Sequence, residues 1–272
     1  MIESKSVLHY DLIEKIADGH LGEVYLALDK ERSQQVALRI LGPGIANDSE
    51  KVLRIGTSVR EAAALNHPSI ATVYGLWSDS DSTFLVTEYV SGSRIGTQHN
   101  GKTFPLRQAV DLGLQIAEAL SEASDKSVVH GGIKPSNVLI TSSGRVKLLD
   151  FGFPPDLHHK MPGMDMDEIP YRSPENLSQA IVDHRSDVYA AGILLYEMIN
   201  ARQPFAASSV QELREKIMRR QPALMCRPDF DMPTELLRTV GRCLQKDPAR
   251  RYQTASELAA DLTNIKATLQ FF

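Results

Sequence analysis

The feature that most constrains the fold of this chain is a change in its hydrophobic pattern between the N-terminal part, called the front, and the C-terminal part, called the back. The front alternates apolar and polar residues in stretches broken by Gly, Asp and Ser, which predicts strands at HYDLIEKIA, GEVYLALD, QQVALRI, SIATVYGLW and TFLVTEYV. One helix is predicted among them, from about Asp48 to Leu65, with Asn47 or Asp48 as its cap. From Leu106 onward apolar residues recur at helical spacing, as in LRQAVDLGLQIAEALSEA, DVYAAGILLYEMIN, VQELREKIM, ELLRTVGRCL and TASELAADLTNI. This order predicts an α+β protein of two lobes with a crevice between them.

Length and charge narrow the class of protein. The chain has 272 residues, enough for a two-lobed domain, and its net charge of −4 offers no basic patch for nucleic acid. No apolar run approaches the roughly 18 residues of a membrane span. The first residues lack the positively charged region followed by an apolar region that is typical of a signal peptide. Two cysteines, Cys226 and Cys243, provide neither a disulfide framework nor a metal-spaced set. We therefore expect a cytoplasmic chain, or the cytoplasmic part of a longer, membrane-anchored protein.

A series of short motifs runs through the chain in a fixed order. The motifs are ADGHLGEVY, VALRI, LVTEYVSGS, VVHGGIKPSNVLI, VKLLDFGF, YRSPENL, HRSDVYAAGILLYEM and KDPARRYQTASEL. Each alone is weak evidence, since a Gly-containing hairpin or an apolar strand is common. Together, from about Tyr10 to Ile265, they resemble the bacterial Ser/Thr protein kinases of the eukaryotic-like type. The resemblance implies a bilobal protein-kinase-like domain over residues 1–272, with a β-rich N-lobe (1–88), a helical C-lobe (89–272) and a hinge near Glu88 to Val90.

An ATP site between the lobes is the first functional implication of the resemblance. Gly19 and Gly22 match two glycines of the loop that covers the phosphates, and Ala17 replaces a third. The residues implied to surround adenine are Val24, Ala37, Leu139, the gatekeeper Thr87, and the backbones of Glu88 and Val90. These apolar residues could equally serve only to fill the core between the lobes, because an apolar slot must be packed in either case.

The phosphate and metal positions are partly altered. Arg39 stands where the family has the phosphate-binding Lys, and Ser58 stands at the place of that residue's Glu partner. A shifted pair of Arg39 with Glu61 is one alternative, and a solvated Glu61 is the other. Asn137 and Asp150 match the two ligands of Mg²⁺. They could instead have structural roles, Asn137 tying its loop and Asp150 capping a turn.

The catalytic and regulatory positions depart further from the family. Gly132 replaces the Asp that acts as base, and Gly131 replaces the Arg that would hold a phosphate on the activation segment. That segment, Phe153 to Ile169, contains no Ser, Thr or Tyr. Both partners of a phosphorylation switch are therefore missing together.

Lys134 is retained from the catalytic loop, and it needs a negative partner in the cleft. Counting back from Tyr171 places Glu168 where active relatives carry a Thr that bonds to this loop. We predict a Glu168–Lys134 ion pair. The alternatives are that Asp167 is the partner, or that the acidic stretch is solvated.

The residues that hold the fold together are kept. The resemblance implies a Glu175–Arg251 pair, an Asp187 that binds the catalytic-loop backbone, and a stack of His130 on Phe151. The favoured hypothesis is a pseudokinase that binds another protein, a signalling partner or an active kinase. The rivals are a weak ATP- and Mg²⁺-dependent phospho- or nucleotidyl transferase, and an ordinary active kinase. ATP and Mg²⁺ are expected to bind weakly if they bind, and no nucleic acid is expected as a partner.

Overall fold

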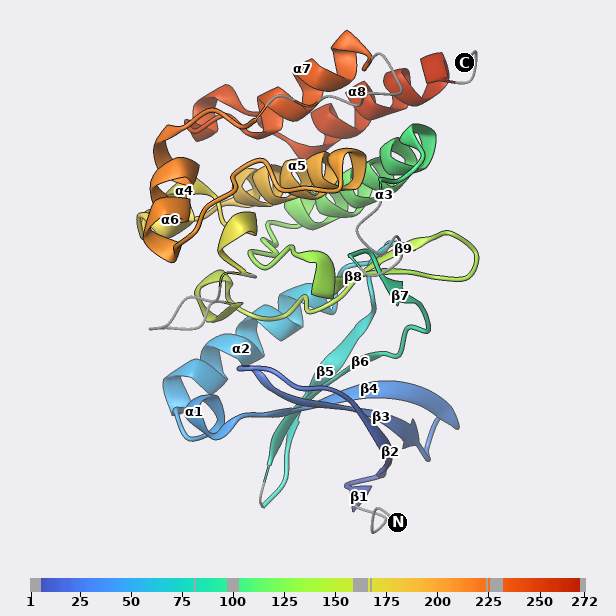
Figure 1. Cartoon of the computed structure of the whole chain (residues 1–272). Coiled ribbons are helices and arrows are strands. Elements are labelled where there is room, and N and C mark those ends of the chain that lie inside the picture. The colour runs from blue at the N-terminus through green and yellow to red at the C-terminus, as the bar shows by residue number, and fades with distance from the viewer. Residues whose placement is uncertain are drawn as a thin grey trace.

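The computed structural model describes residues 6–80, 82–96, 103–158, 166, 168–223, 225 and 232–269. Figure 1 shows a strand-rich lobe formed by the beginning of the chain and a larger helical lobe formed by the rest. The α+β, two-lobed architecture expected from the sequence is therefore present.

A six-stranded antiparallel sheet forms most of the first lobe. Its order is β1-β2-β3-β4-β6-β5, with β1 at Ser6–Val7, β2 at Tyr10–Ala17, β3 at Gly22–Asp29, β4 at Gln34–Leu41, β5 at Val73–Ser78 and β6 at Thr83–Glu88. Alternation buries Val36, Leu38, Phe84 and Val86 on one face of the sheet, as the period of two predicts. The strands expected from the sequence are confirmed.

Two helices accompany this sheet, α1 (Pro43–Ala46) and α2 (Ser49–Ala62), and α2 contacts β5. Asp48 is the cap of α2, since its carboxylate accepts a hydrogen bond from the backbone N–H of Lys51 at 3.1 Å. Of the two caps the sequence allowed, the structure selects Asp48. Helix α2 buries Ile55, Val59 and Ala62 in the main hydrophobic core.

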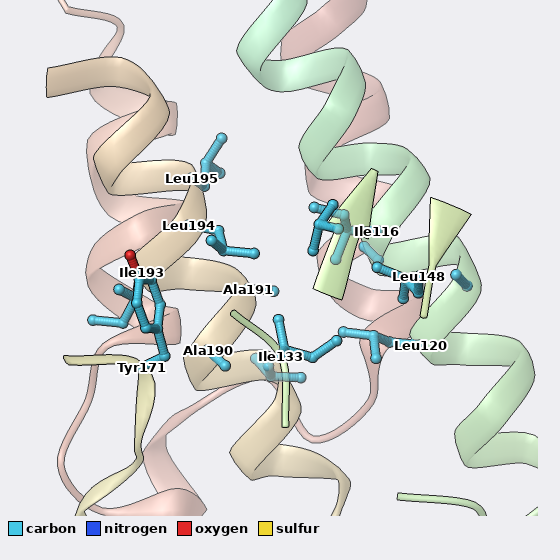
Figure 2. Packing of buried hydrophobic residues seen from close by; sticks show 14 of the residues in the cluster. Ile116, Leu120, Ile133, Leu148, Tyr171, Ala190, Ala191, Ile193, Leu194 and Leu195 are labelled. Atoms are coloured by element: carbon cyan, nitrogen blue, oxygen red, sulfur yellow. The ribbon is translucent and has the colours of Figure 1, made fainter. Parts of the chain in front are cut away.

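The second lobe is built around α5 (His184–Asn200). Its remaining helices are α3 (Leu106–Asp125), α4 (Pro174–Leu177), α6 (Val210–Arg219), α7 (Thr234–Cys243) and α8 (Ala255–Thr268). Helix α5 is apolar on nearly all sides because α3, α7 and α8 pack around it. Figure 2 shows side chains of α3 and α5 filling the space between these helices, with Ile133 between Ala190 and Leu120. The five helices predicted in the back half of the sequence are confirmed as α3 and α5 to α8.

Short elements line the side of the helical lobe that faces the sheet. They are β7 (Ser93–Arg94), β8 (Val138–Ile140), β9 (Val146–Leu148) and the 3-10 turns η1 (Pro135–Asn137), η2 (Pro155–His158) and η3 (Ile169–Tyr171). A further 3-10 turn, η4 (Pro248–Arg250), lies between α7 and α8 in the chain. Turn η2 lies within the segment from Phe153 to Ile169, and η3 begins at the last residue of that segment. Among the described residues, no helix combines the length and apolarity that crossing a membrane requires.

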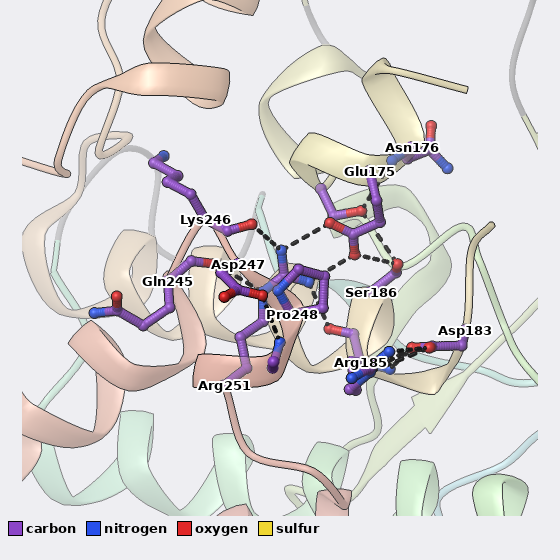
Figure 3. A network of polar contacts seen from close by, with 12 residues as sticks. Glu175, Asn176, Asp183, Arg185, Ser186, Gln245, Lys246, Asp247, Pro248 and Arg251 are labelled. Atoms are coloured by element: carbon purple, nitrogen blue, oxygen red, sulfur yellow. Dashed lines mark hydrogen bonds and ion pairs between the residues drawn. The ribbon is translucent and has the colours of Figure 1, made fainter. Parts of the chain in front are cut away.

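The three expected anchors of the fold are present. Arg251 donates to both carboxylate oxygens of Glu175, at 2.6 and 2.7 Å, within the network drawn in Figure 3. Asp187 accepts the backbone N–H groups of His130 and Gly131, each at 2.8 Å. The rings of His130 and Phe151 lie 4.5 Å apart between centroids. The contacts of Asp187 and Phe151 hold the start of the loop at residues 130–137 in place.

Candidate functional site: the cleft between the lobes

A cavity of about 570 Å³ lies between the two lobes, within the size range of small-molecule sites. The predicted residues that line it are Ala17, Gly19, Val24, Ala37, Arg39, Thr87, Glu88, Val90, Lys134, Asn137, Leu139 and Asp150. Gly22, Ser58, Gly131 and Gly132 do not line it, although Gly131, Gly132 and Lys134 line a smaller adjoining pocket with Glu168. Pairing in the sheet explains much of this grouping, because β4 pairs Ala37 with Thr87 on β6 and Arg39 with Val24 on β3.

The turn between β2 and β3 covers one end of the cavity. The N–H of Gly22 donates to the carbonyl of Gly19 at 3.0 Å, and Gly22 has a φ of +127°. A Cβ at Gly22 would lie 1.9 Å from the carbonyl oxygen of Ile40, so only glycine lets this turn approach β4. At the tip, a ring nitrogen of His20 lies 3.0 Å from the carbonyl oxygen of Leu157 in η2. Sequence reasoning missed this contact between the two lobes, and no local pattern signals it.

Arg39 and Asp150 both line the cavity, and their side chains form an ion pair with a distance of 2.5 Å between nitrogen and oxygen. The guanidinium carbon of Arg39 also lies 5.6 Å from the centroid of the Phe153 ring. The alternative pairing of Arg39 with Glu61 is therefore wrong, because Arg39 bonds to Asp150 and Glu61 is exposed on α2, as the other alternative expected. Ser58 is half-buried on the same helix. The backbone of Asp150 has a φ of +64°, and this left-handed turn directs its carboxylate into the cleft.

Lys134 and Glu168 form the ion pair that the sequence predicted, with 2.5 Å between the amine and one carboxylate oxygen. Their side chains are only 20% and 17% exposed. The Arg172 guanidinium lies 3.9 Å from the other oxygen of Glu168, and burial lowers the pKa of Arg172. Asp167, the alternative partner, lies outside the described residues. A carboxylate from the segment before η3 thus occupies the neighbourhood of the loop that carries Gly132.

Gly131 and Gly132 are held by backbone contacts. Gly131 has a φ of +70°, and a Cβ there would lie 2.5 Å from the Cβ of Pro155. The first turn of η2 therefore fills the place where a side chain at 131 would begin. The carbonyl of Gly132 accepts a hydrogen bond from the side-chain amide of Asn137 at 2.9 Å, so Asn137 does tie its own loop.

Comparison with known proteins agrees with this geometry. A family model described as protein kinase domain matches residues 10–262. The chain is 31% identical to Serine/threonine-protein kinase PrkC of Bacillus subtilis over 258 residues, which are 93% of this chain and 40% of PrkC. It is also 31% identical to Serine/threonine-protein kinase PknB of Mycobacterium leprae over 265 residues, covering 94% of this chain and 43% of PknB. The chain thus spans about two fifths of the length of the curated relatives it matches.

Solved structures give the same result for the fold. A crystal structure of a mutant PknI kinase domain from Mycobacterium tuberculosis superposes with a TM-score of 0.76 at 25% sequence identity. The superposition covers 98% of this chain and 99% of that domain. The two-lobed arrangement seen in Figure 1 is accordingly the protein kinase fold.

Proposed function

This chain belongs to the protein kinase family, among the bacterial eukaryotic-like Ser/Thr kinases, and we propose that it is a pseudokinase that acts by binding another protein. In this proposal residues 1–272 are one domain whose lobes meet after Glu88. The domain works in the cytoplasm, alone or as part of a longer, membrane-anchored protein. Nucleotide binding is weak and is not coupled to phosphoryl transfer.

The observation that carries the proposal is the absence of an available base in the described part of the cleft. Gly132 has no side chain to accept a proton from a substrate hydroxyl. The two carboxylates nearest the expected reaction site, Asp150 and Glu168, are each bonded to a cation of the protein, Arg39 and Lys134. Loss of one general base typically lowers a rate by about 10²–10⁴. The ion pair at Lys134 adds to this loss, because it places Glu168 beside the loop that a substrate hydroxyl would have to approach.

The segment after Phe153 supports a binding role. Pro155 packs on Gly131, Asp156 forms an ion pair with Arg54 of α2, and the carbonyl of Leu157 contacts His20. These contacts link the segment to both lobes without any phosphate, and the sequence from 153 to 169 contains no Ser, Thr or Tyr to carry one. The described part of the segment, residues 153–158, is thus held by both lobes, and a surface held in place lowers the cost of ordering when a protein partner binds.

A transfer assay tests the proposal. Purified protein is incubated with ATP labelled on the γ phosphate, and separately with ATP labelled on the α phosphate, together with generic protein substrates. We expect no label in either case, and the α label covers nucleotidyl transfer. Incorporation that Asp150→Ala abolishes would overturn the proposal, whereas incorporation that survives this substitution identifies a contaminating kinase.

A further inference from the structure

The carboxylates around the cleft share one property that bears on its ligand. Among the described residues that line the cavity, each of the four carboxylates has a cationic side chain as partner. The pairs are Asp18 with Lys15 and Glu88 with Lys147, both at 2.8 Å, and Asp150 with Arg39 and Glu168 with Lys134, both at 2.5 Å. Each carboxylate of the described lining thus has a cationic partner before any ligand enters, with Lys15 shared between Asp18 and Glu23.

This charge distribution does not fit a resident Mg²⁺. Magnesium takes oxygen ligands in a near-octahedral shell and relies on one or two carboxylates together with substrate phosphates. Among the described residues, Asp150 is the one carboxylate at the expected metal position, and the guanidinium of Arg39 is bonded to its Oδ1 atom. A dication bound to Asp150 would have to share the single negative charge of that carboxylate with the guanidinium. The expectation that Asn137 and Asp150 hold Mg²⁺ is therefore not supported by the donor set.

The same arrangement suits an anion. Arg39 has five N–H donors on a planar group, and the bond to Asp150 uses one of its terminal nitrogens, Nη2. A planar guanidinium can bind a carboxylate on one side and a phosphate on another, which a lysine, as a compact point charge, does less well. The apolar side chains of Val24, Ala37 and Leu139 line a slot in the same cavity as this charge. The slot and the charge together match a planar heterocycle that carries phosphates.

We propose that the cleft binds a purine nucleotide as the free polyphosphate anion, without a divalent metal, and that Arg39 provides the positive charge at the phosphates. This inference deepens the proposed function, because it specifies the ligand of a cleft that does not transfer phosphate. It can fail independently, since binding and transfer are measured separately.

Calorimetric titration of the purified protein tests the metal dependence, with ATP in EDTA, ATP in excess Mg²⁺, and adenosine as the three ligands. We expect ATP to bind in EDTA, and excess Mg²⁺ to weaken this binding several-fold because it neutralises part of the phosphate charge. Adenosine should bind more weakly than free ATP and should not respond to Mg²⁺. ATP binding that requires Mg²⁺ or is tightened by it would overturn the inference, as would no binding of ATP under either condition.

Substitutions then test the role of Arg39. Arg39→Met should weaken the binding of free ATP about tenfold, the size expected of one charge-assisted hydrogen bond, and should affect adenosine less. Lys30→Met is the matched control, since it removes one positive charge from an exposed side chain after β3 that does not line the cavity. Asp150→Asn should preserve or tighten the binding of free ATP, because it releases the guanidinium. Loss of ATP binding in Asp150→Asn would instead indicate a metal site and contradict the inference.

If Arg39→Met does not fold, Arg39→Lys provides the second variant, with an expected smaller loss for free ATP. Equal affinities of the original protein, Arg39→Lys and Lys30→Met for free ATP would contradict a specific role of the guanidinium. Label transfer by the original protein would overturn the pseudokinase proposal. The calorimetric comparison of ATP binding in EDTA and in Mg²⁺ would still test this inference. An ATP affinity that requires Mg²⁺ or is raised by it, without label transfer, would overturn only this inference.

Discussion

The partly buried Lys134 has a negative partner supplied from a distant part of the chain. Its amine lies in the cleft beside a loop that carries glycines at 131 and 132, and Glu168 reaches it from 34 residues away. A charge that is only 20% exposed is costly without a partner, so the carboxylate at 168 stabilises the loop.

The first prediction concerns this pair. Removing the charge of Glu168 by Glu168→Gln should destabilise the protein by about 1–2 kcal/mol, because the hydrogen bond is charged and mostly shielded from water. A double-mutant cycle with Lys134→Met, measured by urea denaturation, isolates the coupling between the two side chains. The matched cycle on Lys30 and Asp11, 48% and 43% exposed, should give clearly less. Equal coupling in the two cycles would mean that the Glu168 pair is only a surface contact.

At the scale of elements, η2 acts as a connector between the lobes. It packs on the loop of the helical lobe through Pro155, on α2 through Asp156, and on the glycine turn through Leu157. The absence of a side chain at Gly131 is what lets η2 lie this close, so a change in sequence at one position determines the placement of a whole turn.

The second prediction tests that dependence. Gly131→Ala must accept a φ of +70° and a Cβ placed 2.5 Å from Pro155, so η2 has to move. Gly144 is a matched control, since it has a φ of +78° but no atom within 4 Å of its Cβ position. Gly144→Ala should cost about 1–2 kcal/mol for the backbone alone, and Gly131→Ala should cost a further ~1–3 kcal/mol. Similar unfolding free energies for the two variants would show that the contact with Pro155 is unimportant.

At the scale of the whole molecule, Glu175 and Arg251 connect parts of the helical lobe that are far apart in sequence. The side chain of Arg251 is fully buried and that of Glu175 is 9% exposed. Figure 3 shows Arg251 also bonded to backbone carbonyls of Gln245, Lys246 and Arg185. All three guanidinium nitrogens of Arg251 therefore donate hydrogen bonds. Burial acts to raise the pKa of Glu175, but the bonds and charge of Arg251 and the hydroxyl of Ser186 outweigh it. The pKa of Glu175 is therefore lowered below its ordinary value.

A pH dependence of stability is the third prediction. A carboxylate with a lowered pKa contributes stability that is fully present above its ordinary pKa of 4.5 and is lost as the pH falls through its folded value. Urea denaturation of the original protein should therefore show a steeper loss of stability below pH 4.5 than Glu175→Gln does. At pH 7 the variant should be less stable by about 3–5 kcal/mol, because Arg251 is left buried without its carboxylate.

The comparison with the variant is needed because other buried acids act in the opposite direction. Burial raises the pKa of both Asp187 and Glu197, so these groups favour the fold at low pH and lose that contribution as the pH rises through their folded values. Both are present in the original protein and in Glu175→Gln, so their effects cancel in the difference. Parallel stability curves for the two proteins below pH 4.5 would contradict the prediction.

The sequence by itself determined the elements and their order. Alternation and helical spacing are local properties of the backbone, so β2 to β6, α2, α3 and α5 to α8 could be predicted from them, as could the two lobes. The spacing of motifs then placed residues such as Glu168 and Glu175 opposite their partners by resemblance. These predictions succeeded because each depends on a short window or on a fixed count along the chain.

Only the tertiary structure decided how the two lobes and the segment between them contact one another. Arg39 bonds to Asp150, 111 residues away, rather than to Glu61, and no pattern within either strand or helix selects between those partners. The contacts of Pro155 with Gly131 and of Leu157 with His20 likewise depend on how closely the lobes approach. Such contacts arise from packing between surfaces that are distant in sequence, and the charge balance of the cleft results from that packing.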